Sequence, residues 1–137
     1  MAILLDSSAI VAAADTADLN HAAAVAWFRR ADEPLLLGAM TLGEIDVVLQ
    51  RELGAEASLS VVEAIVGGAI RLIAPTDADL TRAGELLRAA PEHRPRLADA
   101  VLVANAERLV VRRVATFDRR PIAILRPRHV RALDLEP

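Results

Sequence analysis

The chain has 137 residues, which is the length of one ordinary domain. It contains no cysteine, and all 16 of its basic residues are arginine. Disulfides, thiolate metal sites, cysteine nucleophiles, lysine-dependent phosphate loops and Schiff-base chemistry are therefore excluded. Aromatic residues make up 2% of the chain and its net charge is −3, so neither a base-stacking platform nor a uniformly basic surface is expected. Eight of the arginines nevertheless lie in residues 107–137, beside four acidic residues, so this quarter of the chain is a candidate for local phosphate binding, with plain solvated surface as the alternative.

The N-terminus shows no sign of a targeting segment, because it lacks basic residues and reaches an acid at Asp6. No uninterrupted apolar run approaches the ~18 residues needed to cross a bilayer. We therefore expect a soluble protein of the cytoplasm.

The first half of the chain alternates short apolar runs with helical patterns. The run at 2–5 is followed directly by Asp6, as expected for a buried strand that ends at an acid. Thr41 and Glu44 have the spacing of a capping box, which predicts that a helix starts there. In chain order we predict a strand at 2–5, helices at 7–14 and 20–30, a strand at 35–40, and helices at 41–52 and 58–66.

The second half continues this alternation. Gly67 and Gly68 end the preceding helix, and Pro75 ends the apolar run that follows. We predict a strand at 69–74, a helix at 77–90, a polar loop at 91–95, a helix at 97–109, a strand within 110–115, a short fifth strand at 122–125 and a tail at 131–137.

This order of elements is typical of an α/β fold. Apolar strands that alternate with helices predict a three-layer α/β/α domain over residues 1–137, with a central, mostly parallel sheet of four or five strands. Right-handed crossovers bring the carboxyl ends of such strands to one edge, which is where open α/β sheets bind ligands.

Four acidic residues are expected near that edge. Asp6 follows the first strand, Glu44 lies just past the second, and Asp118 follows the fourth. Asp99 lies among apolar residues in the first turn of the helix that precedes the fourth strand. Each acid alone is also explained as a helix cap, a dipole-compensating charge or a turn residue. Their predicted proximity favours a functional cluster.

Four neighbouring carboxylates repel one another unless a cation lies between them or some are protonated. Mg²⁺ or Mn²⁺ suits oxygen ligands of this kind, and the three histidines are too scattered to favour zinc. Such an ion polarises a phosphoryl oxygen and activates water. The residues alone therefore favour metal-assisted phosphoester chemistry.

Four segments, in order, resemble the motifs of the PIN-domain family. They are ILLDSSAI at 3–10, TLGEI at 41–45, LADAVLVA at 97–104 and VATFDRR at 114–120. Their spacing matches as well, so the resemblance covers nearly the whole chain. A free-standing PIN-like domain of this size is most similar to the toxin of a VapBC-type toxin–antitoxin pair.

The resemblance implies a Mg²⁺-dependent endoribonuclease, with Mn²⁺ as a substitute ion. Metal-activated water is then expected to hydrolyse an RNA phosphodiester, leaving a 5′-phosphate and a 3′-hydroxyl. The catalytic, metal-holding residues implied are Asp6, Glu44, Asp99 and Asp118.

Residues around these acids receive supporting roles. The hydroxyls of Ser8 and Thr116 are expected to orient the carboxylates, with turn or cap residues as the alternative. Arginines near the same edge are expected to hold RNA phosphates, with plain surface charge as the alternative for each. These arginines are Arg94, Arg96, Arg119 and Arg120.

The resemblance also implies protein partners, namely a second copy in a homodimer and a VapB-like antitoxin. Helices within 12–26 and 47–66 are candidate contact surfaces, with burial in the core as the alternative.

Two other functions stay open. One is a non-catalytic PIN-like module that binds RNA or protein. The other is a different aspartate-dependent phosphotransfer or hydrolase domain, which the absence of lysine and of a D-x-D motif after the first strand disfavours.

Overall fold

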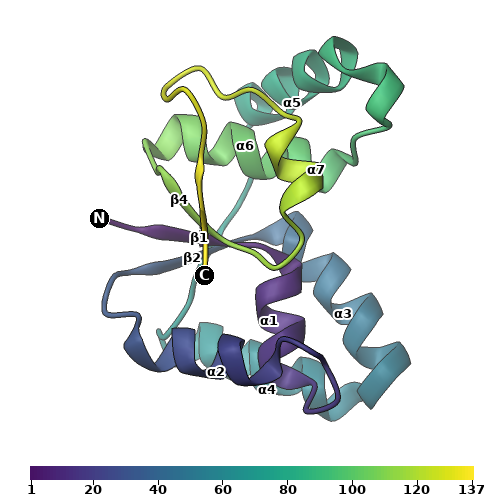
Figure 1. Ribbon diagram of the computed structural model, residues 1–137, viewed down its shortest axis with the longest axis vertical. Helices are drawn as coiled ribbons and strands as arrows, with labels where there is room; N and C mark the ends of the chain where they lie inside the picture. Colours follow the sequence, from purple (N-terminus) through teal and green to yellow (C-terminus); the bar gives the residue numbers. More distant parts are fainter.

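The centre of the molecule is one sheet of five strands, as a computed structural model that describes residues 1–137 shows (Figure 1). All neighbouring pairs are parallel, and the strand order is β3-β2-β1-β4-β5. Leu4 in the central strand is in register with Leu36 on one side and Val114 on the other. The strands are β1 (Ile3–Leu5), β2 (Leu35–Gly38), β3 (Arg71–Ile73), β4 (Arg113–Ala115) and β5 (Asp134–Glu136).

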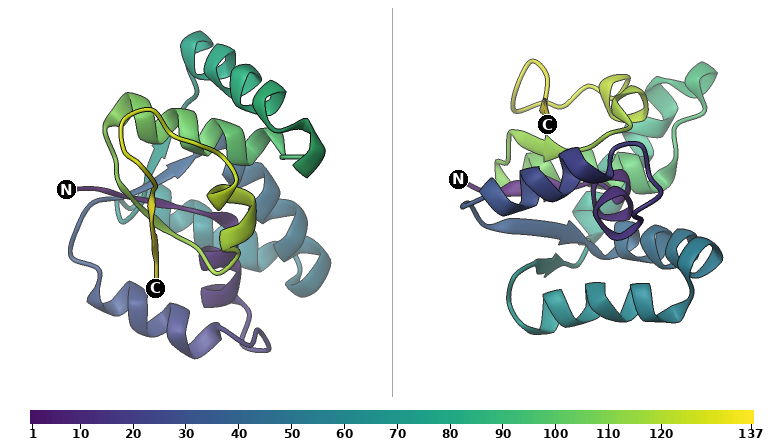
Figure 2. Two further views of the ribbon diagram at one scale, coloured as in Figure 1. Left: turned by 45° about the horizontal axis from the view of Figure 1, so that its top comes forward. Right: turned by 60° about the horizontal axis from the view of Figure 1, so that its bottom comes forward.

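Helices cover both faces of this sheet, which confirms the predicted three-layer α/β/α architecture (Figures 1 and 2). Four helices lie on one face, namely α1 (Ser7–Ala14), α2 (His21–Arg30), α3 (Ala39–Leu53) and α4 (Ala55–Val66). On the other side lie α5 (Asp77–Ala89), the 3-10 turn η1 (Pro91–His93), α6 (Leu97–Leu109) and α7 (Arg119–Ala123). None of these helices is both long enough and apolar enough to span a membrane.

Alternation along β1 divides the core in two. Ile3 and Leu5 pack with the buried side chains of α1–α4, including Trp27. Leu4 points to the opposite face and packs with Leu102 of α6. A strand with apolar residues on both faces belongs at the centre of a covered parallel sheet, as the apolar run predicted.

The start of α3 differs from the prediction. Strand β2 ends at Gly38, and α3 begins at Ala39 with no side-chain cap, so Thr41 and Glu44 lie inside the helix. A complete capping box occurs instead at Thr76 and Asp79, where each side chain bonds the other residue's backbone N–H. Glu44 therefore has no capping role.

The C-terminal segment corrects two further predictions. Residues 122–125 belong to α7 and its end rather than to a strand, because Ile122 and Leu125 are buried at helical i, i+3 spacing. Residues 131–137 are not a tail, since they contain β5, which pairs with β4 at the sheet edge. Its sequence, Asp134-Leu135-Glu136, has no apolar run, so the hydrophobic pattern gave no signal for this edge strand.

Candidate functional site

Asp6 lies at the carboxyl end of β1, where its side chain is buried and fixed by two hydroxyl groups. Its Oδ2 atom accepts hydrogen bonds from Ser8 Oγ at 2.8 Å and from Thr116 Oγ1 at 2.7 Å. Although Asp6 occupies the position before α1, its side chain makes no capping bond, so the helix-cap explanation is wrong.

Backbone N–H groups orient both hydroxyls toward Asp6. Ser8 Oγ accepts from the Phe117 N–H at 2.9 Å, and Thr116 Oγ1 accepts from the Asp118 N–H at 3.0 Å. Each hydroxyl proton is therefore free to point at Asp6. The contacts predicted for Ser8 and Thr116 are present, and they hold one oxygen of the carboxylate while Oδ1 accepts no hydrogen bond.

Asp99 is the second buried acid of this edge, with a side chain that is 3% exposed. Burial raises the pKa of this carboxyl; the charge and hydrogen bond of Arg96 oppose the shift, and the charges of Asp6 and Glu44 reinforce it. The charges of Asp6 and Glu44 both act on Asp99, and Arg96 lies within ion-pair distance of both Asp99 and Glu44, so three of the four predicted acids lie near one another.

Arg96 lies between two of these acids. Its Nε atom donates to Asp99 Oδ2 at 3.1 Å, and its Nη1 atom lies 3.7 Å from Glu44 Oε1. Burial alone disfavours the charged guanidinium, but Asp99, Glu44 and Asp6 outweigh it and raise the pKa of Arg96. The residue predicted to hold RNA phosphate is thus a counter-ion of the acidic cluster in this structure.

The other predicted residues lie toward the rim. Asp118 is exposed at the start of α7, and its carboxylate forms no ion pair or hydrogen bond. Arg94 is exposed in the loop after η1, whereas Arg119 donates to the backbone carbonyl of Pro137. Arg120 lines a hollow of about 130 Å³ together with Asp99.

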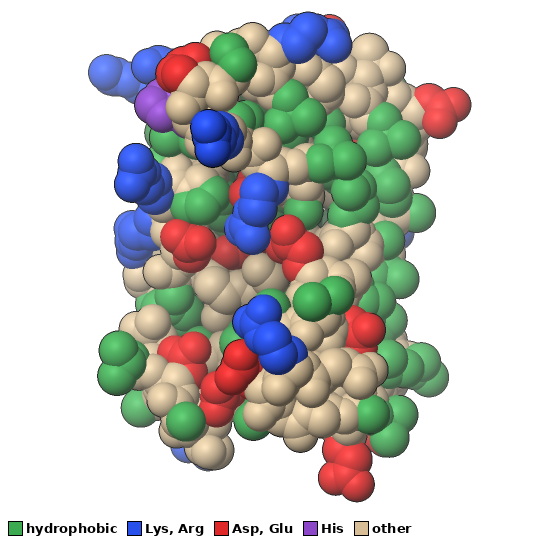
Figure 3. Space-filling model, turned by 90° about the vertical axis from the view of Figure 1, so that its right-hand side faces the viewer, with side chains coloured by type: hydrophobic (Ala, Val, Ile, Leu, Met, Phe, Trp, Pro, Cys, Tyr) green, Lys and Arg blue, Asp and Glu red, His purple; other side chains and the backbone are tan.

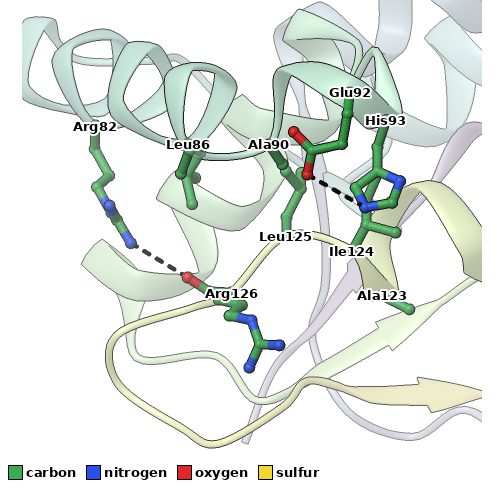
Figure 4. A pocket seen from close by; sticks show the side chains of 10 residues that line it. Arg82, Leu86, Ala90, Glu92, His93, Ala123, Ile124, Leu125 and Arg126 are labelled. Atoms are coloured by element: carbon green, nitrogen blue, oxygen red, sulfur yellow. Dashed lines mark hydrogen bonds and ion pairs between the residues drawn. The ribbon is translucent and has the colours of Figure 1, made fainter.

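A larger hollow of about 590 Å³ adjoins this one, and both include His93 and Ile124 (Figure 4). It lies between α5, η1 and α7, and it has a mixed lining in which Leu86 and Leu125 stand beside Arg82, Glu92 and Arg126. Figure 3 shows acidic and basic side chains next to one another across the middle of the face at the carboxyl edge. The acidic residues thus lie beside basic side chains and next to a hollow on the surface of the molecule.

The acidic cluster has the donor chemistry of a site for a hard divalent cation, because its potential ligands are all carboxylate oxygens. Their spacing is wider than such a site requires. No three His, Asp or Glu side chains are close enough to hold one ion as they stand. A Mg²⁺ ion would therefore bind through one or two carboxylates with water completing its coordination, or the carboxylates would have to move closer together.

One buried polar residue near this edge escaped the sequence analysis. Asn105 of α6 is 1% exposed, and neither its Nδ2 nor its Oδ1 atom has a hydrogen-bond partner. It faces the end of β2, since a Cβ atom on Gly38 would lie 3.3 Å from Asn105 Nδ2. An asparagine within an apolar helix was the available signal.

The fold and the sequence agree with a known family. The family model described as "PIN domain" matches residues 3–126. The chain belongs to the PIN-domain family. The resemblance stated from the four motifs is thereby confirmed.

Individual relatives of this PIN domain are similar over most of its length. The chain is 30% identical over 125 residues to ribonuclease VapC26 of Mycobacterium tuberculosis, covering 91% of this chain and 93% of that protein. Its fold matches the crystal structure of M. tuberculosis VapC20, a sarcin–ricin loop cleaving toxin, with a TM-score of 0.83 and 22% identity over 94% and 98% of the two chains. It also matches VapBC2 of Rickettsia felis bound to a promoter DNA fragment, with a TM-score of 0.69 and 13% identity over 99% and 98%.

Proposed function

We propose that this PIN domain is a Mg²⁺-dependent endoribonuclease that acts as the toxin of a toxin–antitoxin pair, with Mn²⁺ as a substitute ion. The observation that carries the proposal is the burial of Asp6 and Asp99 beside Glu44 at the carboxyl edge of the sheet. Burying like charges together costs stability, and no capping role explains them. The relationship to ribonuclease VapC26 supports RNA as the substrate.

In this proposal Asp6, Asp99 and Glu44 hold the metal, and Asp118 completes the site from the rim. The bound ion would supply activation of water and neutralisation of charge on the phosphate. Ser8 and Thr116 hold Asp6 through its Oδ2 atom, which leaves Oδ1 without a hydrogen bond and available to a metal. Arg120 and the hollow around His93 offer the RNA a phosphate contact and a place for an adjoining nucleotide.

The test is the incubation of purified, antitoxin-free protein with total cellular RNA, with Mg²⁺ or with EDTA, beside an Asp6→Ala Asp99→Ala variant. We expect discrete cuts with 5′-phosphate ends that require both the metal and the two aspartates. Removal of both ligands is expected to lower the rate by about 10³-fold or more, since the metal contributes several kcal/mol to such reactions. Intact RNA in every lane, from a folded protein that binds no Mn²⁺, would favour the non-catalytic binding module instead.

We further propose that a VapB-like antitoxin lays an apolar helix on α3 and α4. Exposed apolar side chains gather there, including Val47, Leu59, Val62 and Val66, and hydrophobic groups line one edge of the face in Figure 3. A hollow of about 390 Å³ between the two helices is lined by Leu42 and Val61, among others. The neighbour VapBC2 of R. felis is itself named as a toxin–antitoxin pair, which supports a partner of this kind.

Substitution of Val62 by aspartate is expected to weaken antitoxin binding by about tenfold or more, because a charge would be buried in an apolar interface. Leu80→Asp on α5 is the matched control, since Leu80 is 44% exposed and Val62 is 45% exposed. Calorimetric titration with the antitoxin measures the affinity of each variant. Equal losses of antitoxin affinity in the two variants would contradict the proposal that the antitoxin binds on α3 and α4.

We also propose that the protein forms a homodimer. A monomer mass in sedimentation at micromolar concentration would contradict this proposal.

A further inference from the structure

We propose that Arg96 is a built-in counter-ion that occupies the place of the metal in the metal-free protein, so that a divalent cation must displace it to bind. The inference rests on the proposed metal-dependent function. Its basis is the position of the guanidinium, which contacts Asp99 Oδ2 with one nitrogen and lies near Glu44 Oε1 with another.

The guanidinium and a divalent cation are alternatives at this position. An arginine side chain stays charged at every physiological pH, so it cannot yield to the metal by losing a proton. Two cations on the same carboxylate oxygens repel each other, and this repulsion is strong where water is scarce, as at the 3%-exposed side chain of Asp99. Metal binding is therefore expected to compete with the present Arg96 ion pairs.

The same contact explains the spacing of the acids. Asp99 and Glu44 bind different nitrogens of one planar group, which holds their carboxylates on either side of it. In this arrangement no three acidic side chains converge on one point. Withdrawal of Arg96 would leave Asp99 and Glu44 without their shared counter-ion, and a divalent cation would then neutralise them.

Arg96 is also free to leave. Its side chain is 56% exposed, and its backbone is extended, with φ −84° and ψ 149°, just before the first turn of α6. The displaced guanidinium then reaches the outer surface, where the RNA backbone is expected.

Equilibrium binding of Mn²⁺, followed by electron paramagnetic resonance, tests the competition without any catalysis. Arg96→Gln is expected to bind Mn²⁺ about tenfold more tightly than the wild type, because a competing unit charge is removed. Arg120→Gln is the matched control, since Arg120 lines the same hollow as Asp99 but forms no ion pair. It also removes one positive charge, yet we expect its Mn²⁺ affinity to stay within about twofold of the wild type.

Thermal unfolding gives a second measurement. The increase in Tm that saturating Mn²⁺ produces should be larger for Arg96→Gln than for the wild type at the same metal concentration. Unchanged or weaker Mn²⁺ binding by a folded Arg96→Gln protein would overturn the inference while leaving the proposed function intact. An equal increase in Mn²⁺ affinity in Arg120→Gln would also overturn the inference. Absence of Mn²⁺ binding in all three proteins would overturn both proposals.

Discussion

Asp99→Asn should make the metal-free protein more stable at neutral pH, by on the order of 1 kcal/mol, and abolish RNA cleavage. Burial raises the pKa of Asp99, and the charges of Asp6 and Glu44 add to the shift against the opposing effect of Arg96. The fold therefore places this carboxyl where its charged form is less favourable than in water. Urea unfolding in the presence of EDTA measures the gain, and an RNA cleavage assay measures the loss of activity.

The effect depends on pH in a defined direction. An acid whose pKa is raised by folding destabilises the folded state fully above that raised pKa, and this cost disappears as the pH falls toward the unfolded value, near 3.8. The stabilisation by Asp99→Asn should therefore be largest at neutral pH and shrink toward pH 4. A variant less stable than the wild type at pH 7, or a gain independent of pH, would contradict the prediction.

Asp79 supplies the matched control, because it is equally buried, at 2% exposed, but pairs with Arg108 at the opposite end of α6 from Asp99. Burial opposes its ionisation, yet hydrogen bonds from Arg108 and the Thr76 backbone outweigh this and lower the pKa of Asp79. Its contribution is present above the unfolded pKa and is lost as the pH falls through the lowered folded value. Asp79→Asn should therefore destabilise the protein at pH 7, by about 2 kcal/mol, and leave RNA cleavage intact.

Removal of the Glu107 side chain should destabilise the protein by about 2–3 kcal/mol, because a poorly exposed arginine loses its bidentate partner and keeps only the more exposed Glu85 as an ion-pair partner. Arg82 makes a bidentate ion pair with Glu107, at 2.9 Å from Nε to Oε2 and 2.9 Å from Nη2 to Oε1. Only 17% of the Arg82 side chain and 13% of the Glu107 side chain are exposed. Urea unfolding of Glu107→Ala measures the loss.

Glu107 also fastens the C-terminal segment to the helical layer. Its Oε1 atom accepts the Arg128 backbone N–H at 2.9 Å, and Arg82 donates to the Arg126 carbonyl at 3.3 Å (Figure 4). This segment leads to β5, whose Glu136 carbonyl accepts the Thr116 N–H at 2.7 Å. Glu107→Ala is therefore expected to loosen the support of Thr116 as well.

Glu52→Ala is the control for this experiment, since the Arg51–Glu52 pair is 67% and 50% exposed. An exposed pair contributes about 0–1 kcal/mol, so this substitution should change the free energy of unfolding little. Glu107→Gln keeps the acceptor for the Arg128 N–H but removes the charge. Its loss of unfolding free energy should therefore lie between those of Glu107→Ala and Glu52→Ala. Equal stability of Glu107→Ala and Glu52→Ala would show that the buried network does not stabilise the fold.

The local patterns of the sequence determined the architecture. Apolar strands bounded by helical periodicity predicted β1 to β4 and the helices between them, because a parallel sheet covered on both faces needs strands without alternation. The acids at strand ends followed from the same reasoning, since a parallel sheet brings those ends to one edge. Strand β5 and helix α7 escaped prediction, because the first is polar and the second too short to show a period.

Only the tertiary structure decided what surrounds each acid. Residues 6 and 116 are 110 positions apart, and their hydrogen bond depends on the pairing of β1 with β4. The place of Arg96 between Asp99 and Glu44 depends on how α6 packs near α3, which no local spacing encodes. The sequence by itself determined which groups were available for chemistry. The packing of distant segments decided their burial, their charge partners and the direction of the Asp99 pKa shift, because these depend on neighbours in space rather than along the chain.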